Sequence, residues 1–179
     1  MFKIALIGSM SVGKTTLFQL LSQSPKFKDF SFLDETAMAI IRSGGIHPVD
    51  MDDLGRQNFQ LKVYEAQVNN EKNAIKNNQS FITDRSILDG LAYSWEFDNF
   101  QTMFELTRQH LEFTQYTHIF YLPIEFGFDN SDRSVEDQNF QKLIDTRLLG
   151  IVQTLDQKII PLKGNSLERC EQIVKSIFG

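Results

Sequence analysis

The chain has 179 residues, of which 41% are hydrophobic, and this length fits one compact domain that buries a core without disulfides or a structural metal. Its single cysteine, Cys170, excludes an intrachain disulfide framework and a cysteine-rich zinc site, as expected for a cytoplasmic protein. The net charge of -5 and the scattered lysines and arginines provide no basic footprint for duplex nucleic acid, so we do not expect nucleic acid to be the main partner.

Short apolar runs alternate along the chain with longer stretches of helical spacing. The apolar runs predict strands at residues 2–7, 30–34, 80–83, 117–122 and 158–162. The stretches between them predict helices at residues 14–23, 35–43, 52–78, 86–96, 99–115, 135–156 and 166–178. This alternation predicts an α/β fold over residues 1–179, a three-layer sandwich with a five-stranded parallel sheet and helices on both faces. The first apolar run is too short to span a membrane, and we expect no membrane partner.

A glycine-rich segment joins the first predicted strand to the first predicted helix. It matches the G-x-x-x-x-G-K-[ST] pattern in full, and with the threonine that follows it comprises Gly8, Ser9, Met10, Ser11, Val12, Gly13, Lys14, Thr15 and Thr16. The glycines of this pattern let backbone N–H groups turn toward phosphate oxygens at the positive end of a helix. The lysine neutralises the β and γ oxygens, and the threonine hydroxyl can ligate Mg²⁺. A guanine-reading Asn-Lys-x-Asp segment is absent, which argues against a GTPase. We expect ATP and Mg²⁺ as cofactors.

The predicted helix at residues 52–78 is long. Asp50 or Asp52 is expected to cap its start. Apolar residues recur every seven positions and predict one stripe packed on the body, formed by Leu54, Leu61, Val68 and Ile75. Asn and Gln are frequent at residues 67–79, which indicates a solvated helix end.

Charged residues follow two of the predicted strands directly. Asp34 and Glu35 come after the second strand, and Asp84 and Arg85 come after the third. In an open parallel sheet, ligands bind beyond the carboxyl ends of the strands, so these side chains are candidates for chemistry beside the phosphate loop. A carboxylate can accept the proton of an acceptor hydroxyl, and an arginine can hold phosphate charge. The alternative is that Asp34 and Asp84 cap the helices that follow them.

Three segments in this order resemble the P-loop nucleoside and nucleotide kinases. They are residues 8–15, the run Asp34-Glu35-Thr36-Ala37, and the run from Thr83 to Tyr93, which reads TDRSILDGLAY. The chain is most similar to the branch of small AAA-like ATPase and kinase domains that includes nicotinamide riboside kinases, and it also resembles deoxynucleoside and thymidylate kinases. The resemblance implies metal or water positioning by Asp84, an acceptor or phosphate contact by Arg85, and a catalytic base at Glu35 or Asp34.

The same resemblance implies an acceptor pocket and a lid. Acceptor-binding helices are expected at about residues 35–78, where Gln60 is similar to the residue that reads an acceptor base. Arg56 and Tyr64 lie four residues to either side of Gln60 and share its helix face, although a solvated polar face explains all three equally well. Relatives often carry an arginine where this chain has Ala39, and the nearest substitute is Arg42. The lid is expected at residues 124–134 with Arg133 as its arginine, and Arg147 is a weaker candidate.

These observations predict a kinase that transfers the γ-phosphoryl group of ATP to a nucleoside or nucleoside monophosphate. Two other hypotheses remain open, an ATP-dependent regulatory module that signals to a partner protein and a kinase that acts on a modified base in DNA. The sequence does not decide between a monomer and a homodimer.

Overall fold

The computed structural model describes residues 1–44, 46–125 and 138–179. Five strands form one parallel sheet in the order β2-β3-β1-β4-β5: β1 (Lys3–Ile7), β2 (Ser31–Leu33), β3 (Phe81–Asp84), β4 (His118–Tyr121) and β5 (Ile160–Pro161). The helices are α1 (Lys14–Gln23), α2 (Thr36–Arg42), α3 (Asp53–Lys76), α4 (Ile87–Tyr93), α5 (Phe100–Thr114), α6 (Gln138–Thr154) and α7 (Ser166–Phe178), and the short 3-10 helices are η1 (Pro25–Phe27) and η2 (Pro48–Asp50). The predicted α/β fold with a five-stranded parallel sheet is confirmed.

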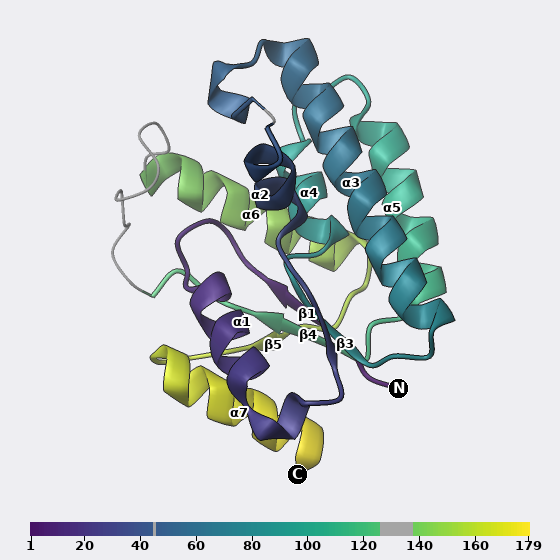
Figure 1. The fold of residues 1–179 in the computed structure, drawn as a ribbon. Helices are drawn as coiled ribbons and strands as arrows, with labels where there is room; N and C mark the ends of the chain where they lie inside the picture. The colour runs from purple at the N-terminus through teal and green to yellow at the C-terminus, as the bar shows by residue number, and fades with distance from the viewer. Residues whose placement is uncertain (45, 126–137) are drawn as a thin grey trace.

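Two layers of helices cover the sheet (Figure 1). Ile4 and Leu6 of β1 point to one face, where they join α1, η1 and α7 in a single apolar cluster. Ala5 and Ile7 point to the other face and pack with α3, α4, α5 and α6. The alternation follows from the two-residue period of a strand, and because both faces are covered, Ile4–Ile7 are all fully buried.

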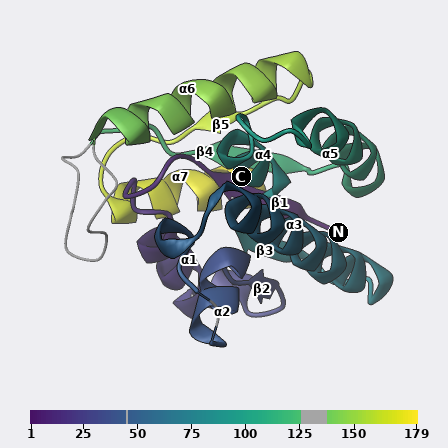
Figure 2. The same ribbon diagram turned by 90° about the horizontal axis from the view of Figure 1, so that it is seen from above.

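Helix α4 lies among α3, α5 and α6 on the second face (Figure 2). It is short and almost entirely buried, which explains why its sequence is more apolar than that of its neighbours. Helix α4 follows β3 directly, so its first turn lies at the carboxyl end of the sheet.

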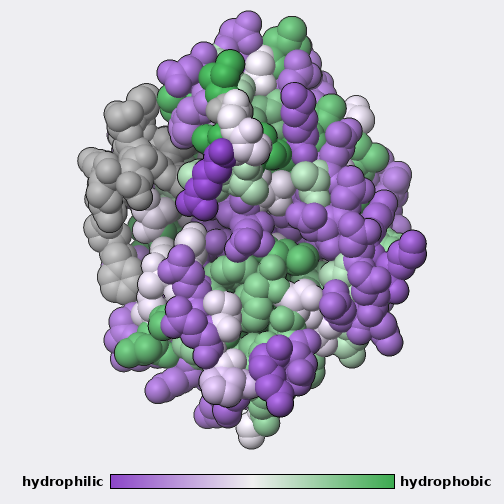
Figure 3. Space-filling view, viewed as in Figure 1, coloured by the Kyte–Doolittle hydropathy of each residue, from purple (hydrophilic) through white to green (hydrophobic). Residues whose placement is uncertain are grey.

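The strand β2 lies at the sheet edge, and its three residues are only half-buried. The face of the molecule that is seen in Figure 1 is mostly polar, with a smaller apolar area in its lower half (Figure 3).

Helix α3 differs from the sequence prediction in the residues that it buries. Asp52 is its N-cap, with Oδ1 accepting a hydrogen bond of 2.7 Å from the Gly55 N–H, whereas Asp50 belongs to η2. Leu54 is 65% exposed, so the predicted seven-residue stripe does not hold at the start of the helix. Twenty-four residues make a helix about 36 Å long. Its first turns therefore extend past the strand ends, at the top of Figure 1, where there is no core to cover Leu54.

The second half of α3 also differs from the solvated end that its Asn and Gln content indicated. Gln67 and Glu71 are 4% and 0% exposed, and they lie beside the buried Val68 and Ala74. A helix drifts by about 20° per seven residues relative to a strict heptad, so the face toward the body shifts along its length. None of the helices in the described ranges is long and apolar enough to cross a bilayer.

The aromatic cluster under α1 and α7 provides a test of this packing. Phe27 is fully buried, with its ring centroid 5.2 Å from that of Phe30 and 5.3 Å from that of Phe178. Phe113 on α5 is 54% exposed. We expect Phe27→Ala to lower the free energy of unfolding by about 3–5 kcal/mol, because it removes a buried ring and leaves a cavity. The loss would appear in thermal unfolding as a fall of at least about 6 °C in Tm.

Phe113→Ala is the matched control, since it makes the same chemical change at an exposed position. It should change the free energy of unfolding by less than about 1 kcal/mol. Equal losses in the two variants would contradict the layer arrangement described above.

Candidate functional site

The loop between β1 and α1 has the backbone of a phosphate-binding cradle. Gly8 has a φ of 152°, and a Cβ at this position would lie 2.6 Å from the carbonyl oxygen of Leu122. Gly13 has a φ of 86° and caps α1 without any side-chain hydrogen bond. The N–H groups of the first helical turn are therefore available to an anion, at the positive end of the helix. Thr15 and Thr16 are exposed on this turn.

Three buried side chains from other helices hold the backbone of this loop. Asp89 on α4, Gln141 on α6 and Arg169 on α7 are each no more than 2% exposed. The hydrogen bonds are from Gly8 N to Asp89 Oδ1 (3.1 Å), from Gln141 Nε2 to Met10 O (2.7 Å) and from Arg169 Nη1 to Val12 O (2.7 Å). Two of them occupy carbonyl oxygens. The carbonyls of Met10 and Val12 are thus turned outward to α6 and α7, away from the inside of the cradle.

Lys14 lies at the base of the loop and is only 5% exposed. Its ammonium donates to the carbonyl oxygens of Gly8 (2.7 Å) and Ser9 (2.5 Å). Burial, followed by the nearby Arg85 cation, lowers the pKa of the Lys14 ammonium to about 8, while the carboxylates of Asp89, Asp84 and Glu35 oppose this shift. Lys14 is therefore a buried cation close to three carboxylates and one guanidinium.

Asp84 and Thr15 meet across the loop. The Thr15 hydroxyl donates to Asp84 Oδ2 at 2.9 Å, and Asp84 is 1% exposed at the end of β3. Burial raises the pKa of the Asp84 carboxyl, and the Lys14 ammonium opposes this rise. The other oxygen, Oδ1, is buried and has no hydrogen-bond partner among the described residues. A hydroxyl and a carboxylate with an unused oxygen beside a phosphate cradle are a donor set that fits Mg²⁺.

Asp84 does not cap α4, so the alternative interpretation of this residue is wrong. Ser86 is the N-cap, with its hydroxyl accepting from the Leu88 N–H at 3.1 Å, and Asp89 completes the capping box through the Ser86 N–H at 2.8 Å. Because Ser86 fills the capping position, the Asp84 carboxylate is available to the phosphate loop.

Glu35 and Arg85 form an ion pair at the same end of the sheet. Arg85 Nε lies 2.8 Å from Glu35 Oε1, and both side chains are largely buried, at 14% and 13% exposure. The contact is electrostatic rather than a well-aligned hydrogen bond. The Arg85 guanidinium also lies over the ring of Tyr93, 5.5 Å from its centroid. The backbone of Arg85 has a φ of 74°, which is uncommon for a residue with a side chain.

The two acidic residues after β2 are placed differently. Glu35 precedes α2 and contacts Arg85, but its side chain makes no capping hydrogen bond. Asp34 is exposed, and the N-cap of α2 is Glu35 rather than Asp34, so the capping alternative for Asp34 is also wrong.

The remaining acceptor candidates are more exposed than the Glu35–Arg85 pair. Arg42 is exposed at the end of α2, and Arg56 is exposed on α3 with Nη2 2.7 Å from Asp53 Oδ1. Gln60 and Tyr64 are half-buried on α3, and burial followed by the nearby Glu71 raises the pKa of Tyr64 to about 12. Their roles as acceptor ligands stay predictions.

The predicted lid at residues 124–134 falls mostly in residues 126–137, so Arg133 lies outside the described residues. Glu125, directly before this segment, accepts hydrogen bonds from Arg169 Nη2 (3.0 Å) and the Gly164 N–H (2.8 Å). Arg147 on α6 is paired with Glu96. That ion pair joins α6 to the turn after α4 and gives Arg147 a partner outside the phosphate loop.

Sequence reasoning missed the side chains that support the site. The Ser86-x-x-Asp89 capping box is a local signal that could have singled out Asp89. Gln141 and Arg169 have no such signal, because their partners are backbone oxygens 131 and 157 residues away in the chain.

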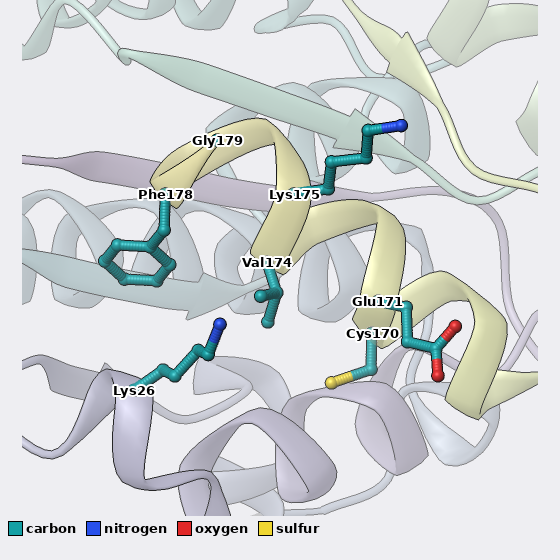
Figure 4. Close-up of a pocket in the computed structure, with 7 residues that line it drawn as sticks. All are labelled: Lys26, Cys170, Glu171, Val174, Lys175, Phe178 and Gly179. Carbon is teal, nitrogen blue, oxygen red and sulfur yellow. The ribbon is translucent and has the colours of Figure 1, made fainter.

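A separate pocket lies away from this cluster, between η1 and α7. It has a volume of about 320 Å³, and Lys26 of η1 faces Val174 and Phe178 of α7 across it (Figure 4). Because η1 follows the far end of α1, this pocket lies at the opposite end of that helix from the phosphate loop.

Among the described residues, no group of three or more His, Cys, Asp and Glu side chains gathers as a metal site. A Mg²⁺ ion at Thr15 and Asp84 would therefore complete its coordination shell with nucleotide phosphates and water.

Comparison with solved structures supports the fold. The NadR protein in complex with NR superposes with a TM-score of 0.76 and 16% identity over 98% of this chain and 50% of that chain. The NadR protein in complex with NAD and AMP-PNP gives a TM-score of 0.74 and 14% identity over 98% and 48%. Deoxyadenosine kinase from M. mycoides, with the products dcmp and dcdp bound, gives 0.71 and 16% over 99% of both chains.

The chain spans about half the length of the NadR chains and almost the whole of the deoxyadenosine kinase chain. No curated protein sequence matches it. A family model described as an AAA domain matches residues 3–169, which is most of the chain. The chain therefore belongs to this AAA domain family and has the α/β fold of the P-loop kinases.

Proposed function

We propose that this protein transfers the γ-phosphoryl group of ATP to a hydroxyl group of a nucleoside-type acceptor. The observation that carries the proposal is the Glu35–Arg85 ion pair, which lies within electrostatic reach of the phosphate-loop lysine, Lys14. A bare ATP-binding module needs the loop and its lysine, but it has no need of a largely buried carboxylate and guanidinium beside them. A phosphoryl transferase needs both.

The nucleotide half of the site is the loop from Gly8 to Thr15. Its backbone N–H groups bind the phosphates, and the Lys14 ammonium turns from the Gly8 and Ser9 carbonyls to the β and γ oxygens. Mg²⁺, held by the Thr15 hydroxyl and Asp84, would supply additional positive charge for the phosphate oxygens.

The acceptor half is the Glu35–Arg85 pair. Glu35 receives or orients the proton of the attacking hydroxyl, and Arg85 fixes the carboxylate and offsets charge that develops during transfer. Asp34 is exposed and does not share this position, which favours Glu35 as the base.

The charges favour a nucleoside over a nucleoside monophosphate. Arg85 is already neutralised by Glu35, and the other two arginine candidates, Arg42 and Arg56, are exposed, with Arg56 paired to Asp53. Arg42 has no ion-pair partner among the described residues, but it is exposed, so an acceptor phosphate would meet the Glu35 carboxylate without an unpaired buried cation among these arginines. A neutral hydroxyl brings no such repulsion. The similar structures hold ligands of both classes, since NR in the NadR complex is a nucleoside and the dcmp and dcdp of deoxyadenosine kinase are nucleotides.

The direct test is ADP release from Mg²⁺-ATP in the presence of a panel of nucleosides and nucleoside monophosphates. We expect release only with an acceptor, and Glu35→Gln should lower kcat by about 10²–10⁴, because it removes the base but keeps the side-chain shape. Asp34→Asn is the matched control, since it removes the neighbouring exposed charge, and it should change kcat by less than about threefold.

Three other outcomes would redirect the assignment. ADP release that does not depend on any acceptor would support an ATPase with a regulatory role. Release that depends on DNA, together with salt-sensitive DNA binding, would support a kinase for a modified base. Full activity in Glu35→Gln would show that the protein transfers phosphate without Glu35 as the base.

The pKa of Lys14 gives a pH test of nucleotide binding. Because that pKa is lowered to about 8 in the free protein, the ammonium loses its proton as the pH rises through this value. The affinity for ATP should therefore be highest below about pH 8 and weaken roughly tenfold by about pH 9, as measured by calorimetry. Lys14→Arg keeps a charge throughout this range, so its affinity should stay nearly constant. A pH-independent affinity in the unaltered protein would show that the Lys14 charge is not needed.

Asp84 gives a test of the magnesium site. We expect Mg²⁺ to increase the affinity for ATP, and Asp84→Asn should reduce this increase by about tenfold or more, because a neutral amide is a weaker ligand. Asp145→Asn is the control for net charge, since Asp145 also has one oxygen without a partner among the described residues and lies within electrostatic reach of Lys14, but its other oxygen accepts from the Tyr121 hydroxyl (2.8 Å) and not from Thr15. If both variants lose the increase equally, the effect comes from net charge and not from ligation.

A further inference from the structure

A buried chain of hydrogen bonds lies behind the Glu35–Arg85 pair, and Gln67 is its central residue. The Gln67 side chain comes from the middle of α3 and is 4% exposed. Its Oε1 accepts from the Thr36 hydroxyl at 2.7 Å. Its Nε2 donates to the Thr83 hydroxyl at 2.8 Å and to Glu71 Oε1 at 2.8 Å. The amide therefore uses its oxygen and both of its protons inside the protein.

The two threonines belong to the two segments that carry the ion pair. Thr36 is the residue directly after Glu35, at the start of α2. Thr83 lies two residues before Arg85, and its hydroxyl donates to the Arg85 carbonyl at 2.8 Å. The Arg85 N–H donates to the Leu6 carbonyl at 3.1 Å. The peptide groups on both sides of the Arg85 Cα are thus fixed, and its φ of 74° is held by Thr83 on one side and β1 on the other.

Glu71 fixes the direction of the hydrogen bonds in this buried chain. Glu71 is fully buried and accepts from the Tyr116 hydroxyl at 2.6 Å, and its other oxygen lies 2.8 Å from His110 Nε2. A carboxylate only accepts hydrogen bonds, so the Gln67 amide must turn its NH₂ group toward Glu71 and its oxygen toward Thr36. The second Nε2 proton then goes to Thr83, whose own proton goes to the Arg85 carbonyl. Each hydroxyl and amide proton of Thr36, Gln67 and Thr83 therefore has one acceptor.

We infer that Gln67 is a positioning residue that sets the distance and orientation of Glu35 relative to Arg85. It joins the start of α2 to the end of β3 through one rigid amide, and the Glu71–His110–Tyr116 cluster holds that amide in one orientation. The inference rests on the proposed roles of Glu35 and Arg85 in transfer. Gln67 contacts neither reacting group, and its effect passes through Thr36 and Thr83.

The test uses two substitutions of Thr83 that separate its hydroxyl from its shape. Thr83→Val keeps the volume and removes the hydrogen bond, and Thr83→Ser keeps the hydrogen bond and removes a methyl group. The readout is the NMR signal of the Arg85 Nε–H in ¹⁵N-labelled protein, assigned with Arg85→Lys. Glu35→Gln gives the reference signal for a weakened pair.

We expect Thr83→Val and Gln67→Met to move the Arg85 signal toward that of Glu35→Gln, while Thr83→Ser leaves it near its original position. In the transfer assay, kcat of the folded Thr83→Val protein should fall by about tenfold to a hundredfold, because the pair is misplaced. The affinity for ATP should stay within about twofold in both Thr83 variants, since the phosphate loop has its own supports. The Thr83→Val/Gln67→Met double variant should lose no more than the larger single loss, as expected for residues in one chain.

An unchanged Arg85 signal in Thr83→Val would overturn the inference. A larger change of that signal in Thr83→Ser than in Thr83→Val would also overturn it, because the lost methyl group would then matter more than the lost hydrogen bond. If Thr83→Val does not fold, Thr36→Val and Thr36→Ser provide the same comparison at the other end of the chain. The NMR readout does not require activity. If the unaltered protein transfers phosphate to no acceptor, the proposed function fails, but the Arg85 signal still decides whether Gln67 positions the pair.

Discussion

The buried ammonium of Lys14 is the charge around which the rest of the site is arranged. It lies close to Glu35, Asp84 and Asp89, with Arg85 as the second cation. An unpaired ammonium at this depth would be very unfavourable, so the carboxylates at the ends of the strands are needed to keep it charged. The same carboxylates are buried, and burial raises the pKa of Asp84 and Asp89 while Lys14 opposes the rise. The Lys14 ammonium and these carboxylates therefore favour each other's charged forms.

Parallel strands make this arrangement possible. Their carboxyl ends lie at one edge of the sheet, so the residues after β1, β2 and β3 meet there although they are far apart in sequence. The sequence could predict this meeting, since the strand positions, the glycine pattern and the charged residues after each strand are all local signals. It could not choose between Asp34 and Glu35, because that choice depends on the angle at which the chain leaves β2. It also could not show that Gln67 and Glu71 are buried, because their amide and carboxylate are satisfied by residues on other elements.

The two halves of the site have separate supports. The phosphate loop is held by Asp89, Gln141 and Arg169 from α4, α6 and α7. The Glu35–Arg85 pair is held through Thr36 and Thr83 by Gln67 of α3, with α5 contributing His110 behind it. Separate supports mean that residues on α2 and α3 can change without disturbing the loop that binds the phosphates. This is a physical reason why chains with only 14–16% identity can keep the same fold.

The separation also explains where specificity must reside. The phosphate loop contacts a part of ATP that is the same for every acceptor, so its geometry carries no information about the second substrate. Under the proposed function, the acceptor would be selected by side chains on α2 and α3. The first turns of α3 extend past the sheet, with Leu54 exposed. A helix end that is not fixed by core packing can move toward a ligand at low cost in stability, whereas the buried part at Gln67 and Glu71 cannot. In the proposed kinase, one helix would thus carry a rigid support for catalysis and an adaptable end for recognition, and the change from exposed to buried residues lies between Leu54 and Gln67.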